Sequence, residues 1–193
     1  MKTIQGALRQ HGFSLLEMMA TISISAIVGS MATASLVSAR RAYQGDGAMR
    51  LVMAQLNTAR EMAITQRHNM EVQFVGGNWV RIVRDEITPG VTTVLMNVAL
   101  EGGAQFALTP GVPDTPDGFG ASSPVAFGTA TTVMFTTDGT LIDSSGTPIN
   151  GTVFLSILNQ QQSARAVTVL GSTGRVRGYK WVVGKASSGW LRV

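Results

Sequence analysis

The sequence contains no cysteine, little charge and only two histidines. Without cysteine the chain forms no disulfide, holds no cysteine-ligated metal and performs no thiol chemistry. Charged residues make up 13% of the 193 positions, and the histidines are His11 and His68. No nucleophile has a base at a recognisable spacing, so we predict no catalytic residue, no metal site, no cofactor and no enzymatic activity.

Charge of one sign is missing from two long stretches of the chain. Five acids and no lysine or arginine lie between Ile87 and Ala164, whereas six bases and no acid lie between Arg165 and Val193. The C-terminal end is therefore predicted to be a cationic surface. Such a surface suits a polyanion or an acidic face of a neighbouring subunit.

Formal charge is also absent from residues 18 to 39, which follow Glu17 and are rich in Ile, Val, Met, Ala and Ser. About 20 apolar residues are enough for an α-helix to cross a bilayer, so we predict one membrane-spanning helix. Lys2 and Arg9 precede the run, which leaves the first residues in the cytoplasm and sends the remainder outward. Glu17 lies at the apolar edge, where an ionised carboxylate needs a cation or a place at headgroup level.

The stretch GFSLLEMMATISI resembles the N-terminal signal of type IV prepilins. The resemblance implies that a prepilin peptidase cuts between Gly12 and Phe13, that Phe13 is then methylated, and that Glu17 pairs with a neighbour's terminal amine. It also implies anchoring in inner membrane lipid with a periplasmic head, and assembly with other pilins or pseudopilins into a periplasmic or extracellular filament. Two alternatives stay open: an ordinary signal peptide cut after Ala32-Thr33-Ala34, and a plain single-span anchor.

These features divide the chain into a leader (1–12), a transmembrane half-helix (13–39), an amphipathic half-helix (40–69) and a β-rich head (70–193). Apolar residues at spacings of three and four run from Ala48 to Ala63, which predicts a helix that packs one face on the head. Gly45 and Gly47 each weaken such a helix by about 1 kcal/mol relative to Ala. They predict either a bend or loosened turn, or a long helix that tolerates both.

The head has the pattern of an antiparallel β domain. Alternating residues on both sides of Gly76-Gly77-Asn78 predict a hairpin of residues 71–75 and 79–84. Further strands are predicted at residues 92–98, 132–136, 140–142, 152–158, 165–170 and 174–183. Residues 102–128 hold four of the six prolines and are predicted to be mostly loop. Asp114 and Asp117 could ligate a cation, but the prolines beside them favour a solvated turn. The predicted fold class is α+β, a long N-terminal helix packed on an antiparallel β-sheet head.

The order of these elements resembles the GspH/FimT group of type IV minor pilins and type II secretion pseudopilins. The matching segments are Leu56–Ala63, Val72–Phe74, Met134–Gly139 and Gly174–Arg177. The resemblance implies a type IV pilin-like fold and a minor subunit of a type IV pilus or a type II secretion filament, without deciding between the two machines. No proline precedes Pro89, which departs from pilins that carry a helix-breaking proline in the apolar half.

The segment Gly174-Arg175-Val176-Arg177 places both arginines on one face of a strand, because residues two apart point the same way. Tyr179 continues that face and Lys180 adds charge nearby, so the strand suits contact with nucleic-acid phosphates and bases. In the FimT branch, the resemblance implies a Gly-Arg-x-Arg motif that binds DNA for uptake in natural transformation, with Arg175 and Arg177 at the matching positions. The alternative is an edge strand with Tyr179 and Trp181 in the core, and we predict subunit contact in preference to DNA binding.

Overall fold

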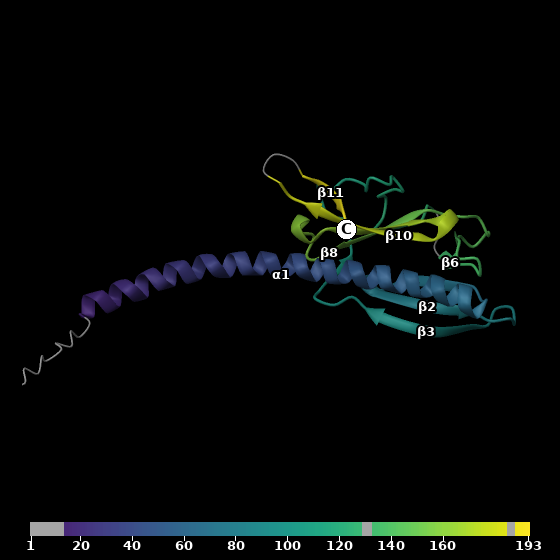
Figure 1. The fold of residues 1–193 in the computed structure, drawn as a ribbon, viewed down its shortest axis with the longest axis horizontal. Helices are drawn as coiled ribbons and strands as arrows, with labels where there is room; N and C mark the ends of the chain where they lie inside the picture. Colours follow the sequence, from purple (N-terminus) through teal and green to yellow (C-terminus); the bar gives the residue numbers. More distant parts are fainter. Residues whose placement is uncertain (1–13, 129–132, 185–187) are drawn as a thin grey trace, which may run out of the picture. The chain divides into compact units, whose positions relative to one another are not determined.

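The computed structural model describes residues 14–128, 133–184 and 188–193, so the predicted processing positions Gly12 and Phe13 lie outside the described residues. The chain divides into two compact units, residues 1–39 and residues 40–193. One α-helix, α1 (Leu15–Gln66), precedes the β head (Figure 1). The strands are β1 (Met70–Val75), β2 (Trp79–Asp85), β3 (Thr92–Ala99), β4 (Gln105–Phe106), β5 (Val125–Ala126), β6 (Val133–Phe135), β7 (Leu141–Ile142), β8 (Gly151–Ser156), β9 (Arg165–Leu170), β10 (Arg175–Val182) and β11 (Gly189–Arg192).

In the first unit, apolar side chains of α1 are not covered by protein. The exposed fraction is 79% for Leu16 and 64% for Ile22. The hydroxyl groups of Thr21, Ser23 and Ser25 donate to carbonyls three or four residues earlier, at 2.9, 2.8 and 2.7 Å. These polar side chains are therefore satisfied within their own helix.

Within the part of the chain that the structure describes, no helix is both long and apolar enough to cross a membrane. The transmembrane half-helix of residues 13–39 therefore stays a prediction.

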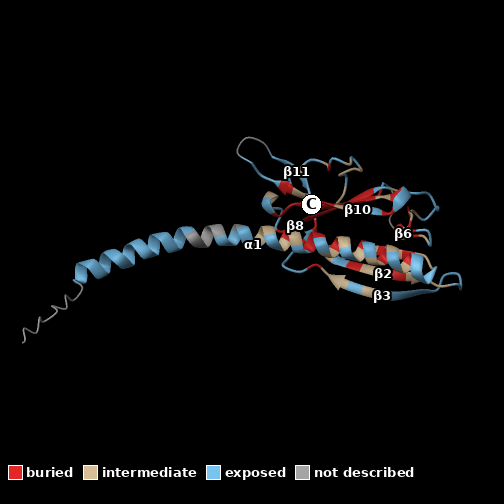
Figure 2. Ribbon diagram, viewed as in Figure 1, coloured by how far each residue is buried: buried red, intermediate tan, exposed pale blue. Residues whose placement is uncertain are grey.

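In the second unit, the predicted apolar stripe of α1 is confirmed by burial. Val52, Leu56, Ala59 and Ala63 have an exposed fraction of 0%. Met49, which the spacing did not single out, is also buried. Buried positions recur along this half of the helix in Figure 2, which is the pattern of a helix that packs one face on a protein core.

The first sheet has the strand order β3-β2-β1-β6-β7, and its neighbouring strands are antiparallel. The hairpin of β1 and β2 pairs Val75 with Trp79, and Gly76 and Gly77 turn the chain with φ values of 62° and 84°. Glycine suits these positions because side chains rarely adopt positive φ. The predicted hairpin and its turn are therefore confirmed, and so is the third strand, β3.

The second sheet has the order β11-β10-β9-β8-β4, and β5 also pairs with β8. The predicted pairing of residues 152–158 with residues 165–170 is confirmed by β8 and β9, which the short 3₁₀-helix η1 (Gln161–Ser163) connects. The sequence missed β4, β5 and β11, which have two, two and four residues. Runs this short show little alternation. The equally short β6 and β7 lie within the strands predicted at residues 132–136 and 140–142, on the two sides of the Asp138-Gly139 turn.

The helix and both sheets form one hydrophobic core. The same cluster contains Leu56 of α1, Val72 and Ile82 of the first sheet, and Val153 and Val167 of the second. The head part of α1 accordingly runs with β2 and β3 along one side and β8 and β10 along the other (Figure 1). The predicted fold class is confirmed: a long N-terminal helix packs on antiparallel sheets in an α+β fold.

The helix is unbroken where the sequence contains Gly45 and Gly47. Residues on both sides of the two glycines are α-helical, so the predicted loosened turn is absent and the helix tolerates both glycines. Gly45 is needed for packing, because a Cβ atom there would lie 2.8 Å from the carbonyl oxygen of Ser163. At Gly47 a Cβ atom would meet nothing within 4 Å.

A buried arginine beside Gly45 joins β9 to the helix. Arg165 has an exposed fraction of 3%. Its Nε lies 2.6 Å from Oδ1 of Asp46, and its Nη2 donates to the carbonyl of Ala42 at 3.0 Å. Its Nη1 donates to the carbonyls of Gln162 and Ala164, so the buried charge is paired and each of its three nitrogens donates a hydrogen bond.

Candidate functional site

Strand β10 presents the predicted DNA-contact residues on two opposite faces. Arg175, Arg177 and Tyr179 lie at alternate positions and share one face, which we call the outer face of the second sheet. Lys180 lies on the other face, together with Gly178, which packs against α1. A Cβ atom at Gly178 would lie only 2.7 Å from Sδ of Met53. The structure therefore brings three of the four residues together and separates Lys180 from them.

The outer face is held by a carboxylate that the sequence analysis assigned to a solvated turn. Asp117 Oδ1 accepts a hydrogen bond from Nη1 of Arg177 at 2.5 Å. Its Oδ2 accepts from Oγ1 of Thr168 at 2.6 Å and from the hydroxyl of Tyr179 at 3.0 Å. The Asp117 side chain is 11% exposed, so the prediction of a solvated turn is wrong for this residue. Asp114 instead organises the loop itself by accepting from the backbone N–H of Gly120 at 2.8 Å.

The protonation equilibria of this cluster follow from its geometry. Burial on its own would raise the pKa of Asp117, but hydrogen bonds from Thr168 and Tyr179 and the charge of Arg177 outweigh it and lower the pKa. Burial, together with the neighbouring Asp117, raises the pKa of Tyr179. The negative charge of Asp117 raises the pKa of Arg177. Aspartate, guanidinium and neutral phenol are therefore the stable forms at neutral pH.

Aromatic rings extend the outer face beyond the Asp117 cluster. Trp181 of β10 packs edge-on against Trp190 of β11, with ring centroids 5.4 Å apart, and Trp190 lies 6.4 Å from Phe154 of β8. The loop covers this group, since Nε1 of Trp190 donates to the carbonyl of Pro113 at 3.0 Å. Tyr179 and Trp181 are 5% and 8% exposed, so both belong to the interior. This is the position that the edge-strand alternative to DNA binding predicted for them.

This arrangement changes what a DNA-binding surface would consist of. Arg175 is exposed, whereas Arg177 is committed to Asp117 and the ring of Tyr179 is buried. DNA binding through Arg175 and Arg177 stays a prediction. Its test requires Arg175→Ala alone, because loss of Arg177 would also leave Asp117 without its charged partner.

The glycine that begins the arginine motif has a structural role. Gly174 adopts a φ of 62°, and a Cβ atom there would lie 2.7 Å from Nε of Arg60. That Nε donates to the carbonyl of Gly139 at 3.2 Å. Three of the segments that carry the family resemblance thus meet at one contact, formed by Arg60, Gly139 and Gly174.

Among the residues that the structure describes, no group of three or more His, Asp or Glu side chains is arranged to hold a metal ion. The Nδ1 atom of His68 lies 2.9 Å from the carbonyl oxygen of Asp85 in β2, so His68 joins the segment that follows α1 to the first sheet.

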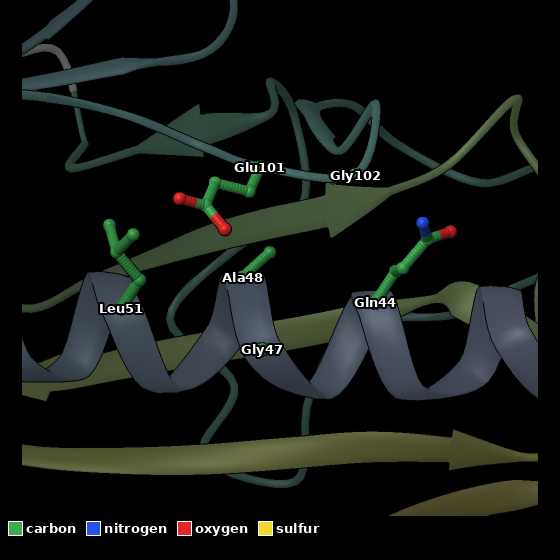
Figure 3. A pocket seen from close by; sticks show the side chains of 6 residues that line it. All are labelled: Gln44, Gly47, Ala48, Leu51, Glu101 and Gly102. Atoms are coloured by element: carbon green, nitrogen blue, oxygen red, sulfur yellow. The ribbon is translucent and has the colours of Figure 1, made fainter.

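A pocket of about 250 Å³ lies where the chain leaving β3 passes α1. In Figure 3 the Glu101 side chain extends toward the helix between Leu51 and Gln44. The lining of the pocket is mainly apolar, with one carboxylate and one amide, and consists of Gln44, Gly47, Ala48, Leu51, Glu101 and Gly102.

The predicted N-terminal site is described only from Ser14 onward. Glu17 lies in the first turn of α1 and is exposed, and its backbone N–H donates to the carbonyl of Ser14 at 3.0 Å. The carboxylate of Glu17 is therefore available at the start of the uncovered apolar helix.

Two protein-family models match the chain, and they identify the class of protein to which it belongs. Residues 8–33 match the prokaryotic N-terminal methylation motif, which is the signal found in prepilin-like proteins. Residues 48–174 match the family of the type II transport protein GspH, and the chain belongs to this family of minor pilins and pseudopilins, which are structural subunits. The resemblance to the GspH/FimT group is thereby confirmed.

Two solved structures are similar in fold to the chain. Both are crystal structures of the type IV minor pilin FimU of Pseudomonas aeruginosa strain PAO1, and both are 15% identical in sequence to this chain. Their TM-scores are 0.47 and 0.46; each comparison covers 74% of this chain and 90% or 95% of the FimU chain. No curated protein matches the sequence.

Proposed function

We propose that the protein is a subunit of a type IV pilus or a type II secretion pseudopilus that assembles by packing of its N-terminal helix. The observation that carries the proposal is the uncovered apolar segment of α1. Leu16, Ile24 and Val28 are 79%, 62% and 61% exposed. Apolar side chains that encircle a helix require burial, either in lipid or among other helices.

The energetics favour such burial. Covering one large aliphatic side chain stabilises an assembly by about 1.5–3 kcal/mol, and the segment offers many of them. The hydroxyl groups of Ser23, Ser25 and Ser30 donate to carbonyls of the same helix, so their transfer out of water leaves no unpaired donor. The segment can therefore be transferred from lipid to a filament core without breaking these bonds.

Glu17 gives the packing its register. Removal of the leader between Gly12 and Phe13 creates an amine, and methylation keeps it able to carry a positive charge. A desolvated carboxylate is stabilised by an adjacent ammonium group, which in a bundle of parallel helices comes from the next subunit. In this proposal the N-terminal helix spans the inner membrane and the head lies in the periplasm. A prepilin peptidase and other pilins or pseudopilins are the partners.

The proposal is tested on the full-length protein in cells that produce it, with Glu17→Ala compared against wild type. We expect wild type to begin at a methylated Phe13 by mass spectrometry and to occur in the sheared filament fraction. Glu17→Ala should be cut and folded but reduced in filaments by about tenfold or more, because its neighbour's amine loses a charged partner.

Three outcomes would contradict the proposal. A mature N-terminus after Ala34 would support the ordinary signal peptide. Retention of residues 1–12 would support a plain anchor. Equal amounts of Glu17→Ala and wild type in filaments would remove the role given to Glu17.

A further inference from the structure

Strand β3 is the outermost strand of the first sheet, so one of its long sides has no neighbouring strand in the described protein. It is eight residues long, Thr92–Ala99, and contains no charged residue and no proline. Val94 is 55% exposed. Proteins usually protect long edge strands with charge, proline or a covering segment, because unpaired backbone groups recruit other strands.

The other sheet edges in the described residues are short or covered. β7 and β4 have two residues each, and Ile142 of β7 bridges to Pro148. β11 has four residues and includes Arg192. The lack of protection at β3 is therefore specific to that edge, which indicates that it is used for contact.

The register shows which backbone groups of β3 are available. Leu100 N–H donates to the carbonyl of Asn78 at 2.7 Å at one end, and Glu86 N–H donates to the carbonyl of Val91 at 3.0 Å at the other. Hydrogen-bonded pairs alternate along an antiparallel ladder, and a bulge between the two ends shifts the alternation once. The backbone groups that point away from β2 are those of Thr92, Val94, Asn97 and Ala99.

Acidic residues flank β3 at both ends. Asp85 lies opposite Thr92, and Glu101 follows two residues after Ala99 and is exposed. Glu86 is already paired with Arg84 at 2.7 Å, but neither Asp85 nor Glu101 has an ion pair within the described residues. A bound segment with basic residues at its ends and an uncharged middle is therefore electrostatically favoured.

We propose that β3 is the docking edge for an extended segment of a neighbouring filament subunit, which joins the first sheet as an additional strand. The segment is uncharged and aliphatic over its paired length and basic at its flanks, and its backbone supplies the hydrogen bonds. The inference rests on the proposed function, which provides the neighbour. The segment differs from β3 itself, because two paired β3 edges impose a two-fold axis, whereas subunits of a filament with parallel helices make head-to-tail contacts.

The edge is tested with Asn97→Pro in the full-length protein, and Asn97→Thr is the matched control. Proline removes one outward N–H and leaves the bonds between β3 and β2 intact, whereas threonine keeps the N–H. We expect equal melting temperatures for the two purified variants in detergent. Asn97→Pro should be reduced in the sheared filament fraction by about tenfold for the one hydrogen bond lost.

A crosslink identifies the occupant. Because the chain has no cysteine, Thr92→Cys places a single thiol on the edge for a photoreactive label in assembling cells. We expect mass spectrometry to map the crosslink to an extended segment of a neighbouring subunit. A crosslink between two β3 strands, a crosslink to a helix, or no crosslink in assembled filaments would overturn the proposal.

The outcomes separate this inference from the function on which it rests. Absence of the wild-type protein from filaments contradicts the proposed function. Wild type present, with Asn97→Pro incorporated as well as Asn97→Thr, contradicts the docking edge alone.

Discussion

At the scale of single residues, Asp117 decides how the outer face of the second sheet is used. Its three hydrogen-bond donors lie 51 to 62 positions later in the chain, on β9 and β10. The local sequence, with a proline immediately before Asp117 and a glycine after it, is typical of an exposed turn. Only the excess of bases after Ala164 hinted that an acid of this loop would find a partner there.

Replacing Asp117 with Asn should destabilise the head by about 1–3 kcal/mol, because the half-buried guanidinium of Arg177 loses its charged acceptor. The loop would then hold the aromatic cluster less tightly. Urea unfolding of the full-length protein in detergent, followed by fluorescence of Trp181 and Trp190, measures the difference. Glu101→Gln, which removes a carboxylate without a described ion pair, is the control, and equal stability of the two variants would contradict the role of Asp117.

Wild type and Asp117→Asn should also differ in how their stability depends on pH. The folded pKa of Asp117 lies below its ordinary value, so the folded state binds fewer protons than the unfolded state in that range. Its stabilisation is therefore fully present above the ordinary value of about 4 and is lost as the pH falls through the folded pKa. We expect the stability gap between wild type and Asp117→Asn to narrow below about pH 4, and a constant gap down to pH 2 would contradict the assignment.

At the scale of secondary structure, the head half of α1 shows how packing can outweigh helix propensity. The two glycines in this part of α1 occupy equivalent local sequence contexts, yet one lies against the Ser163 carbonyl of η1 and the other faces open space. Propensity alone treats them alike, as the sequence analysis did. Their substitution by alanine therefore separates propensity from packing.

Gly47→Ala should stabilise the protein by about 0.5–1 kcal/mol, because it raises helix propensity at an open site. Gly45→Ala should destabilise it by about 1–3 kcal/mol, since the new methyl group meets the Ser163 carbonyl and forces β9 and α1 apart. Thermal unfolding of the two variants beside wild type checks the prediction. Equal shifts of the same sign would show that the close approach at Gly45 is unimportant.

Element predictions from the sequence were accurate where alternation was long enough. The β1–β2 hairpin, β3, β8, β9 and β10 were all recognised, because strands of six or more residues show the two-residue period clearly. The division of the head into two sheets was not predicted, since strand pairing depends on contacts between segments far apart in sequence. Lys180 was predicted to act together with Arg175, although strand parity by itself places the two residues on opposite faces.

At the scale of the whole molecule, the two units differ in what covers their apolar side chains. The main core cluster draws its residues from Ala48 onward. In the first unit, by contrast, Leu15, Met19 and Ile27 are 77%, 62% and 59% exposed. In a filament, packing of the helical segment would cover these apolar side chains. Strand addition at β3 would separately pair the open edge of the first sheet.

A chain of residues 40–193 should fold without residues 1–39, because it retains the whole core cluster and the contacts of Arg165 with Ala42 and Asp46. We expect it to be soluble without detergent, whereas the full-length chain should require detergent or lipid. Circular dichroism and size-exclusion chromatography measure this. A truncated chain that is unfolded or aggregated would show that the first unit is needed for folding of the second.

The sequence by itself determined the long N-terminal helix, its apolar and amphipathic halves, most of the strands and the family, because these depend on local periodicity and on short motifs. Tertiary structure decided the roles of individual residues in the head. Arg177 pairs with Asp117, Arg165 is buried against Asp46, and Gly45 admits a neighbouring carbonyl. Each of these facts is a contact between segments distant in sequence, and their meeting is fixed only when the helix and both sheets close around one core.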